Sequence, residues 1–329
     1  MIKKTTIVLS VGILAGCLLG ISRASALTLI PPSLEFGVNP GEISETSVKV
    51  YNETAETLEL YTEVTNFTAS GETGQPAFDF EAPLAGLASW IEVEAGPISV
   101  EPGERQEIPV TVNVPLEADP GGHYAAIFFV DEPPEVGAGQ VKVASKLGTL
   151  LLAKVAGDIE EAGSLVEFLS GDNQTTFARL PIEFFARFQN SGNVHLRPTG
   201  TITITNLFGG ESGVIDINAA EGATLPDTIR KYEAIWEKAQ VEEANGNAWN
   251  NFWTEFGNER KNFGLGRYKA TLNLTYGAAS DMTASSELTF WVWPWRVIVI
   301  SALLLFVVIW LLIWLIKRYN AWLVKKAQK

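Results

Sequence analysis

The sequence predicts an all-β fold with two tandem immunoglobulin-like β-sandwiches and one C-terminal transmembrane helix. Short runs of alternating polar and apolar residues are separated by turn residues, which is typical of sandwich strands. The second half repeats the order of these runs, and an uncharged apolar segment follows it. The expected parts are a signal peptide (1–26), a first sandwich (27–160), a second sandwich (161–292), a transmembrane helix (293–316) and a cytoplasmic basic tail (317–329).

The chain begins with the features of a secretory signal peptide. The basic start MIKKTT precedes the apolar run IVLSVGILAGCLLGI, and the small residues Ala24 and Ala26 predict cleavage after Ala26. The alternative is lipidation, because the only cysteine, Cys17, follows LAG as in a bacterial lipobox. Cleavage after Ala26 would leave a mature body without cysteine, whose core is stabilised by burial alone.

The first sandwich is predicted from strands in the order SVKVYN, LELYTEV, EIPVTVNV and YAAIFFV. The turns NPGE, EPGE and DPGG separate them at intervals of about ten residues. EPPEVGAGQ is expected to be a long hairpin loop, and SKLGTLLLAKVAG a returning strand that closes the domain near Gly157.

The second sandwich is predicted because its segments match those of the first in order. PIEFFARFQNSGNVHLRPTGTITITN has the strand–turn–strand pattern of VKVYNETAETLEL, and TLPDTIRKYEAIWE that of EPGERQEIPVTVNV. The two halves also share the pattern Gly-x-Tyr-x-Ala, at Tyr124 and at Tyr268. A tyrosine at this place in an immunoglobulin-like sandwich bonds through its hydroxyl to nearby backbone, so both are predicted to be structural corners.

The two histidines are predicted to be structural. His195 follows the turn at Asn190–Asn193 and is expected to begin the outgoing strand, and His123 lies between a glycine turn and a strand. Neither has a carboxylate or cysteine at the spacing of metal ligands, and neither supports a catalytic triad. The sequence therefore predicts no catalytic residue, metal or cofactor, and a protein that is not an enzyme.

The second sandwich contains an insertion at about residues 237–262. From Arg105 to Tyr124 the first half spans 19 residues (124 − 105), whereas from Arg230 to Tyr268 the second half spans 38 (268 − 230). Ile229, Tyr232 and Trp236 also fit helical spacing, so a helix competes with a strand here. We expect a strand to about Trp236 and a helix or loop after it.

Four aromatic residues in this insertion are the candidate binding residues. On a helix, Trp249 with Trp253 and Phe252 with Phe256 form a stripe at i,i+4 spacing. Flat aromatic faces beside asparagine amides are suited to a glycan or a protein partner. The other interpretation is that the stripe covers one end of the sandwich and belongs to its core.

The C-terminal segment Val297–Ile316 has the properties of a membrane span. Its 20 uncharged residues would cross about 30 Å of hydrocarbon as a helix. Aromatic residues flank it at the expected membrane interfaces: Trp291, Trp293, Trp295, Tyr319 and Trp322. Basic residues follow it with no acidic residue after Glu287, which predicts a single-pass cell-membrane protein with an extracellular body and a cytoplasmic tail.

The charge of the outer body is strongly negative. Of the 24 basic residues, three lie in the leader and six from residue 296 onward, which leaves 24 − 3 − 6 = 15 against 38 acidic residues, or −23. This charge argues against nucleic acid as a partner, because its binding needs basic patches. The charge is suited to a soluble, self-repelling surface domain.

Nearly the whole chain resembles the WxL-interacting family of bacterial cell-surface proteins. The resemblance is carried by LTLIPPSLEFGVNPGE, by SVEPGERQEIPVTVNVP leading to DPGGHYAAIFF, and by NSGNVHLRPTGTITITNLFG with LP-x-x-x-R after it. The resemblance implies a first domain that binds peptidoglycan and a second domain that binds a partner surface protein. It assigns neither role to particular residues, and the insertion in the second domain departs from the family's pattern. We therefore expect a non-catalytic, membrane-anchored adaptor, with a scaffold subunit acting through its transmembrane helix as the alternative.

Overall fold

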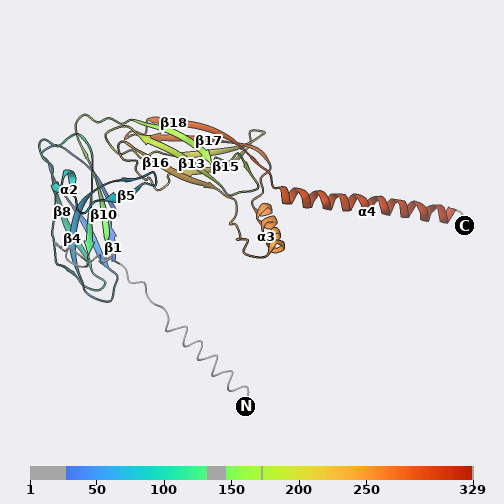
Figure 1. The fold of residues 1–329 in the computed structure, drawn as a ribbon, viewed down its shortest axis with the longest axis horizontal. Helices are drawn as coiled ribbons and strands as arrows, with labels where there is room; N and C mark the ends of the chain where they lie inside the picture. Colours follow the sequence, from blue (N-terminus) through green and yellow to red (C-terminus); the bar gives the residue numbers. More distant parts are fainter. Residues whose placement is uncertain (1–26, 132–145, 172, 328–329) are drawn as a thin grey trace, which may run out of the picture. The chain divides into compact units, whose positions relative to one another are not determined.

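The computed structural model describes residues 27–131, 146–171 and 173–327 (Figure 1). The predicted signal peptide, Cys17 and the loop EPPEVGAGQ lie outside the described residues. The chain divides into two compact units, Met1–Thr68 with Phe78–Asp158 and Ala69–Ala77 with Ile159–Lys329. Each contains an immunoglobulin-like sandwich of two sheets, so the predicted all-β fold class is confirmed.

The first unit packs two sheets of largely antiparallel strands. One sheet has the order β1 (Leu27–Ile30), β3 (Ile43–Asn52), β8 (Arg105–Asn113) and β6 (Ile91–Val93). The other has the order β2 (Ser33–Val38), β10 (Leu147–Val155), β9 (Gly121–Val130), β4 (Leu58–Ser70) and β5 (Gln75–Phe78), with β7 (Ile98–Val100) on β4 and a short α2 (Gly86–Trp90) before β6. In β8, Ile108, Val110 and Val112 are buried at alternate positions, because successive side chains of a strand face opposite sides.

The second unit contains a three-stranded and a five-stranded sheet. The first has the order β11 (Gly163–Ser170), β13 (Ile182–Asn190) and β16 (Thr228–Trp236). The other has the order β12 (Thr176–Phe177), β18 (Met282–Val292), β17 (Gly266–Tyr276), β14 (Thr199–Asn206) and β15 (Glu211–Ile217). Its core is aromatic: Phe290 lies 5.7 Å from Phe184 and 6.1 Å from Trp236, measured between ring centroids.

A buried asparagine ends the corresponding strand in both sandwiches. Asn52 ends β3 and Asn190 ends β13, and both side chains are fully buried. The amide of Asn190 donates to the carbonyls of Val194 (2.7 Å) and Thr224 (2.9 Å), and that of Asn52 likewise donates to two carbonyls. The asparagine turns therefore satisfy buried backbone groups that would otherwise lack partners.

The structure corrects the predicted places of the two histidines. β14 begins at Thr199 and not at His195, which lies buried in the connection before it. Pro198 explains the late start, because it has no N–H to donate to a sheet. His123 lies within β9, where its Nε2 is 2.8 Å from the carbonyl oxygen of Asp119. Among the described residues, no group of three or more His, Cys, Asp or Glu side chains could hold a metal ion.

The end of β4, the turn after it and most of β5 belong to the second unit, as Ala69–Ala77. There the Glu72 carbonyl accepts a hydrogen bond from the Lys231 N–H (2.8 Å), and its carboxylate accepts one from Arg187 Nε (2.8 Å). The bond from Arg187 lowers the pKa of Glu72. The second unit is therefore built from two separate stretches of the chain.

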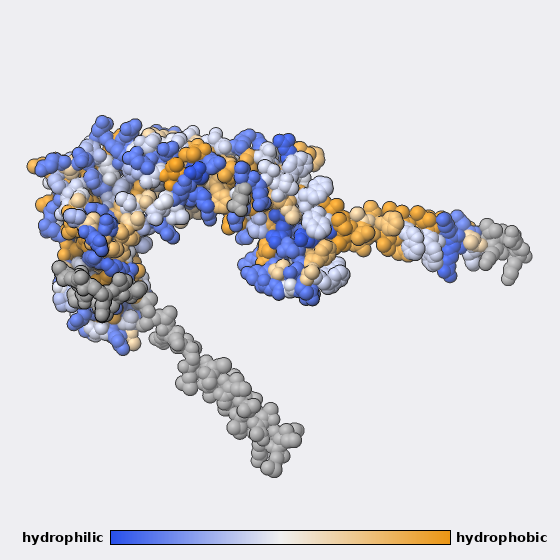
Figure 2. All heavy atoms as spheres, viewed as in Figure 1, coloured by the Kyte–Doolittle hydropathy of each residue, from blue (hydrophilic) through white to orange (hydrophobic). Residues whose placement is uncertain are grey.

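Two longer helices complete the second unit. α3 (Ala248–Lys261) follows β16, which ends at Trp236 as predicted, and Asn247 caps it by accepting from the Asn250 N–H. α4 (Trp295–Ala327) follows β18. Within the described part of the chain, α4 contains the one helical segment long and apolar enough to cross a membrane, Trp295–Leu323, whose most apolar 18 residues have a mean hydropathy of 3.1 (Figure 2).

Candidate functional site where the second unit joins the apolar helix

A buried glutamate of α3 caps the first turn of α4. The side chain of Glu259 is fully buried, and its Oε2 accepts from the N–H groups of Arg296 (2.9 Å) and Val297 (3.1 Å). Its Oε1 accepts from Arg296 Nη1 at 2.7 Å. The first N–H groups of a helix have no partner within it, and the helix dipole favours a negative charge at this end. Glu259 therefore joins α3 and α4 by an ion pair and two capping bonds.

A second acidic residue of α3 extends this cluster. Glu255, one turn before Glu259, accepts from Arg179 Nε (3.1 Å) and Nη2 (3.2 Å) and lies 3.8 Å from Arg296 Nη1. Burial favours its neutral form, but the bonds from Arg179 and the charges of Arg179 and Arg296 prevail and lower the pKa of Glu255. The junction thus holds two carboxylates against two guanidinium groups. We call these four residues the junction cluster.

The segment that leads into α3 is held by two buried asparagines. Asn258 accepts from the N–H of Glu242 (3.0 Å) and donates to its carbonyl (2.9 Å). Asn262 accepts from the N–H of Ala239 at 2.9 Å. Because both side chains are buried, the inserted segment has a fixed path against one side of α3.

The candidate binding residues form an aromatic stripe on α3. Trp249 is 68% exposed and Trp253 is 44% exposed, and their ring centroids lie 5.7 Å apart. Phe252 and Phe256 are half-buried, and the Phe252 ring lies 6.4 Å from that of Trp295 on α4. The two tryptophans are therefore surface residues and not core. The structure also brings the stripe next to one of the predicted membrane-interface residues.

The other predicted interface residues are exposed as well. Trp291 and Trp293 are 48% and 52% exposed, although their N–H groups donate to the carbonyls of Thr175 and Phe177. Toward the end of the apolar segment, Tyr319 and Trp322 are exposed, and their rings stack with centroids 6.1 Å apart. The backbone before α4 is thus hydrogen-bonded to β12 and to Thr175, the residue before it, while the two indole rings face outward.

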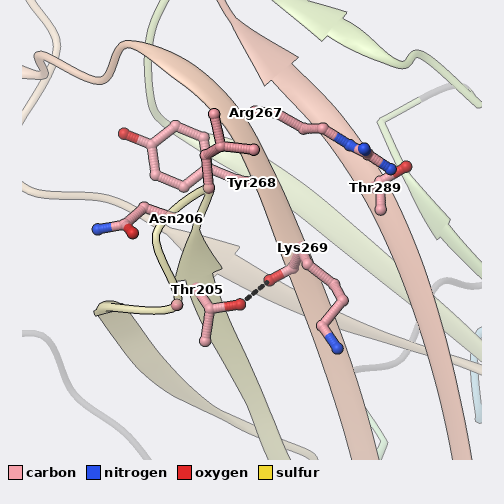
Figure 3. Close-up of a pocket in the computed structure, with 8 residues that line it drawn as sticks. Thr205, Asn206, Arg267, Tyr268, Lys269 and Thr289 are labelled. Atoms are coloured by element: carbon pink, nitrogen blue, oxygen red, sulfur yellow. Dashed lines mark hydrogen bonds between the residues drawn. The ribbon is translucent and has the colours of Figure 1, made fainter.

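An open pocket of about 330 Å³ lies where β14 and β17 meet (Figure 3). Its lining includes Arg267 and Lys269, which flank Tyr268 on β17. Lys269 pairs with Glu287 at 3.0 Å, whereas Arg267 makes no ion pair with any described residue. The corner tyrosine Tyr268 accepts from the Leu265 N–H at 3.2 Å, and the Tyr124 ring packs 5.8 Å from Phe67.

The turn between β14 and β15 exposes two large apolar side chains beside this pocket. Phe208 is 94% exposed and Leu207 is 64% exposed. Asn206 holds the turn by accepting from the N–H groups of Phe208 and Gly210. Neither this turn nor Arg267 was among the binding residues predicted from the sequence. The run NLFGG does indicate an unusual turn, because turns usually carry small or polar residues and this one contains leucine and phenylalanine.

The fold and the site together define a class: paired immunoglobulin-like sandwiches whose second member continues into one long apolar helix. No protein-family model matches the chain, and no curated protein matches it. Among solved structures, it is similar to the class 5 fimbriae chaperone CfaA (12% identity, TM-score 0.38, 80% of this chain and 98% of that one) and to the E. coli chaperone DraB (13%, 0.35, 81% and 97%). A PapD-like domain of human CEP192 matches over 40% of this chain and 84% of its own (14%, TM-score 0.27). These values are too low to indicate a shared activity or partner.

Proposed function

We propose that this chain is a non-catalytic, membrane-anchored adaptor of the cell surface. In this role α4 spans the bilayer, and the sandwiches bind a partner surface protein, cell-wall glycan or both. The observation that carries the proposal is the capping of α4 by Glu259. It makes the apolar helix a continuation of the second sandwich, so a partner bound there would be held close to the bilayer.

The physical chemistry of α4 supports the membrane anchor. Its apolar segment of 29 residues would extend about 43 Å as a helix, enough for the hydrocarbon core and both interfaces. Lys317 and Arg318 follow the most apolar part and favour a cytoplasmic C-terminus. The sandwiches would then be outside, where their net charge of −23, from 15 basic and 38 acidic residues, keeps them soluble.

A tethered adaptor raises the local concentration of its partner without catalysis. The resemblance of the sequence to the WxL-interacting family supports a division of roles, with glycan on the first sandwich and a surface protein on the second. The exposed surface of α4 offers little support for the alternative, a scaffold acting through helix pairing. Its small residues Ser301 and Ala302 are adjacent and form no small-xxx-small pattern.

Protease treatment of intact cells tests the anchor and its orientation. Added protease should remove both sandwiches and spare an epitope placed after residue 317, and the full chain should sediment with membranes. The full chain in detergent should then sediment with peptidoglycan sacculi or crosslink on cells to one defined surface protein. Protected sandwiches, a chain that stays in solution when membranes are removed, or binding to neither partner would contradict the proposal.

A further inference from the structure

We propose that the end of the second unit that carries α4 binds the headgroup layer of the phospholipid bilayer. The contact surface, which we call the interfacial face, consists of Trp249 and Trp253 of α3, Trp293, Phe208 and Arg267. This inference rests on the proposed function, because the face meets a bilayer only if α4 spans one. It assigns the aromatic stripe of α3 to lipid and leaves glycan or protein partners to other surfaces.

The junction cluster places α3 at the level where α4 begins. Glu259 bonds directly to the first-turn residues Arg296 and Val297, so the two helices cannot separate without breaking buried bonds. Figure 1 shows α3 running across the direction of α4 at the same end of the second unit. If α4 crosses a bilayer, α3 then lies along the bilayer surface, as interfacial helices do.

The aromatic side of α3 has the chemistry of the headgroup layer. The contact of Phe252 with Trp295 places this side next to the aromatic belt of α4. Tryptophan combines an apolar ring with a polar N–H and is enriched at membrane interfaces. The carboxylates of α3 do not oppose contact with phosphates, because Glu255 and Glu259 are both paired with arginine.

The turn between β14 and β15 provides a second contact at the same end of the unit. In the sheet, Asn206 of β14 lies opposite Tyr268 of β17, and Arg267 of β17 lies opposite Trp291 of β18. Trp291 is only four residues before the start of α4. Four extended residues span about 13 Å, so the turn and the pocket lie close to the start of the span. Phe208 offers an apolar side chain to the layer, and Arg267 offers a guanidinium, which binds phosphate in two-pronged geometry.

Continuity with α4 and complementary charge favour lipid as the occupant. The exposed rings of α3 and the belt residue Trp295 form one connected set. The pocket beside Phe208 is lined by two cations, Arg267 and Lys269, and by no acidic side chain among the described residues. Lys269 is paired with Glu287, so Arg267 is the cation available to a phosphate. Phospholipid headgroups supply phosphate at the depth where these groups lie.

Single-site fluorescent labels on the full chain test the inference. In a Cys17→Ser background, one cysteine is placed at Trp249, Phe208, Leu304 or Leu116 and carries an environment-sensitive fluorophore. Leu304 lies within α4, and Leu116 is the matched control, because it is 80% exposed in the first unit. The protein is reconstituted in phosphatidylcholine–phosphatidylglycerol vesicles that contain nitroxide lipids labelled either at the headgroup or deep in the acyl chain.

The inference predicts a blue shift and loss of emission at Trp249 and Phe208 with headgroup nitroxide, and no change at Leu116. Leu304 should lose emission with the acyl-chain nitroxide. If the label at Leu304 is quenched while the labels at Trp249 and Phe208 behave like the one at Leu116, the inference is overturned and the membrane anchor stays intact. Absence of quenching at Leu304 would instead overturn the anchor, and the inference with it. Shielding of Trp249 by sacculi or a partner protein without lipid quenching would reassign the stripe to that partner.

Discussion

Replacing Glu259 by alanine should loosen the junction between the second sandwich and α4. The substitution removes a buried ion pair and the acceptor of two N–H groups of α4. The guanidinium of Arg296, whose side chain is only 21% exposed, would keep Glu255 as its acidic neighbour, at 3.8 Å. Breaking a buried ion pair by removing one partner costs about 3–5 kcal/mol. Because the side chain of Arg296 is partly exposed, we expect a value near the lower end, about 3 kcal/mol, or an opening equilibrium raised about 100-fold.

Hydrogen–deuterium exchange on the full chain in vesicles measures this effect. Amides of α3 and of the first turn of α4 should exchange about 100-fold faster in Glu259→Ala, with strands of the first unit unchanged. The control is Glu287→Ala, whose partner Lys269 is 47% exposed, so its loss should cost less than about 1 kcal/mol. If Glu259→Ala loosens α3 no more than the control does, the junction cluster does not hold the two helices together.

Three further predictions concern the second unit. Asn190→Ala should lower its free energy of unfolding by about 2–3 kcal/mol in a denaturant titration, because the buried Val194 carbonyl loses its donor and the Thr224 carbonyl keeps only the N–H of Leu196; a change within error would mean that water replaces the amide. Gly200→Ala should be destabilising by about 1–3 kcal/mol, since its Cβ would lie 1.9 Å from the Asn273 carbonyl oxygen, whereas Gly257→Ala on α3 meets no atom within 4 Å and should be neutral or raise the melting temperature. Equal effects of the two glycine substitutions would contradict this. The pKa of Glu255 is lowered in the folded chain, so its pairing stabilises the fold above the unfolded pKa of about 4.3, and this stabilisation is lost as pH falls below that value. Tryptophan emission of α3 should therefore change below about pH 4.3 in the native chain and change less in Glu255→Gln.

The sandwiches and the apolar helix could be predicted because their signals are local. Alternation in β8 and β17, turn residues between strands and the uncharged run of α4 each follow from neighbouring residues. The end of β16 at Trp236 was predicted for the same reason, and of the two alternatives after it, a helix or a loop, the structure has the helix α3. The start of β14 was predicted too early, because Pro198 has no N–H for the sheet and delays the strand to Thr199.

The junction cluster could not be predicted from the sequence. Arg179 precedes β13 and Arg296 lies on α4, 117 positions apart (296 − 179), and only the folded chain brings Arg179 to Glu255 and Arg296 to both carboxylates of α3. The helical spacing of Glu255 and Glu259 gives no sign of burial, since acidic residues on a helix are usually solvated. The exposed turn at Phe208 differs: its unusual composition was visible, but its closeness to α4 depends on the pairing of β14 with β17.

The participation of Ala69–Ala77 in the second unit limits how the gene can be divided. A fragment that starts at Ile159 would contain every strand of the second sandwich, yet Arg187 would lose Glu72 and the Lys231 N–H would lose its acceptor. A swap of this sandwich between proteins would have to carry the donated turn with it. Recombination at the apparent boundary would therefore yield an incomplete module, and the two halves of this chain are expected to be inherited together.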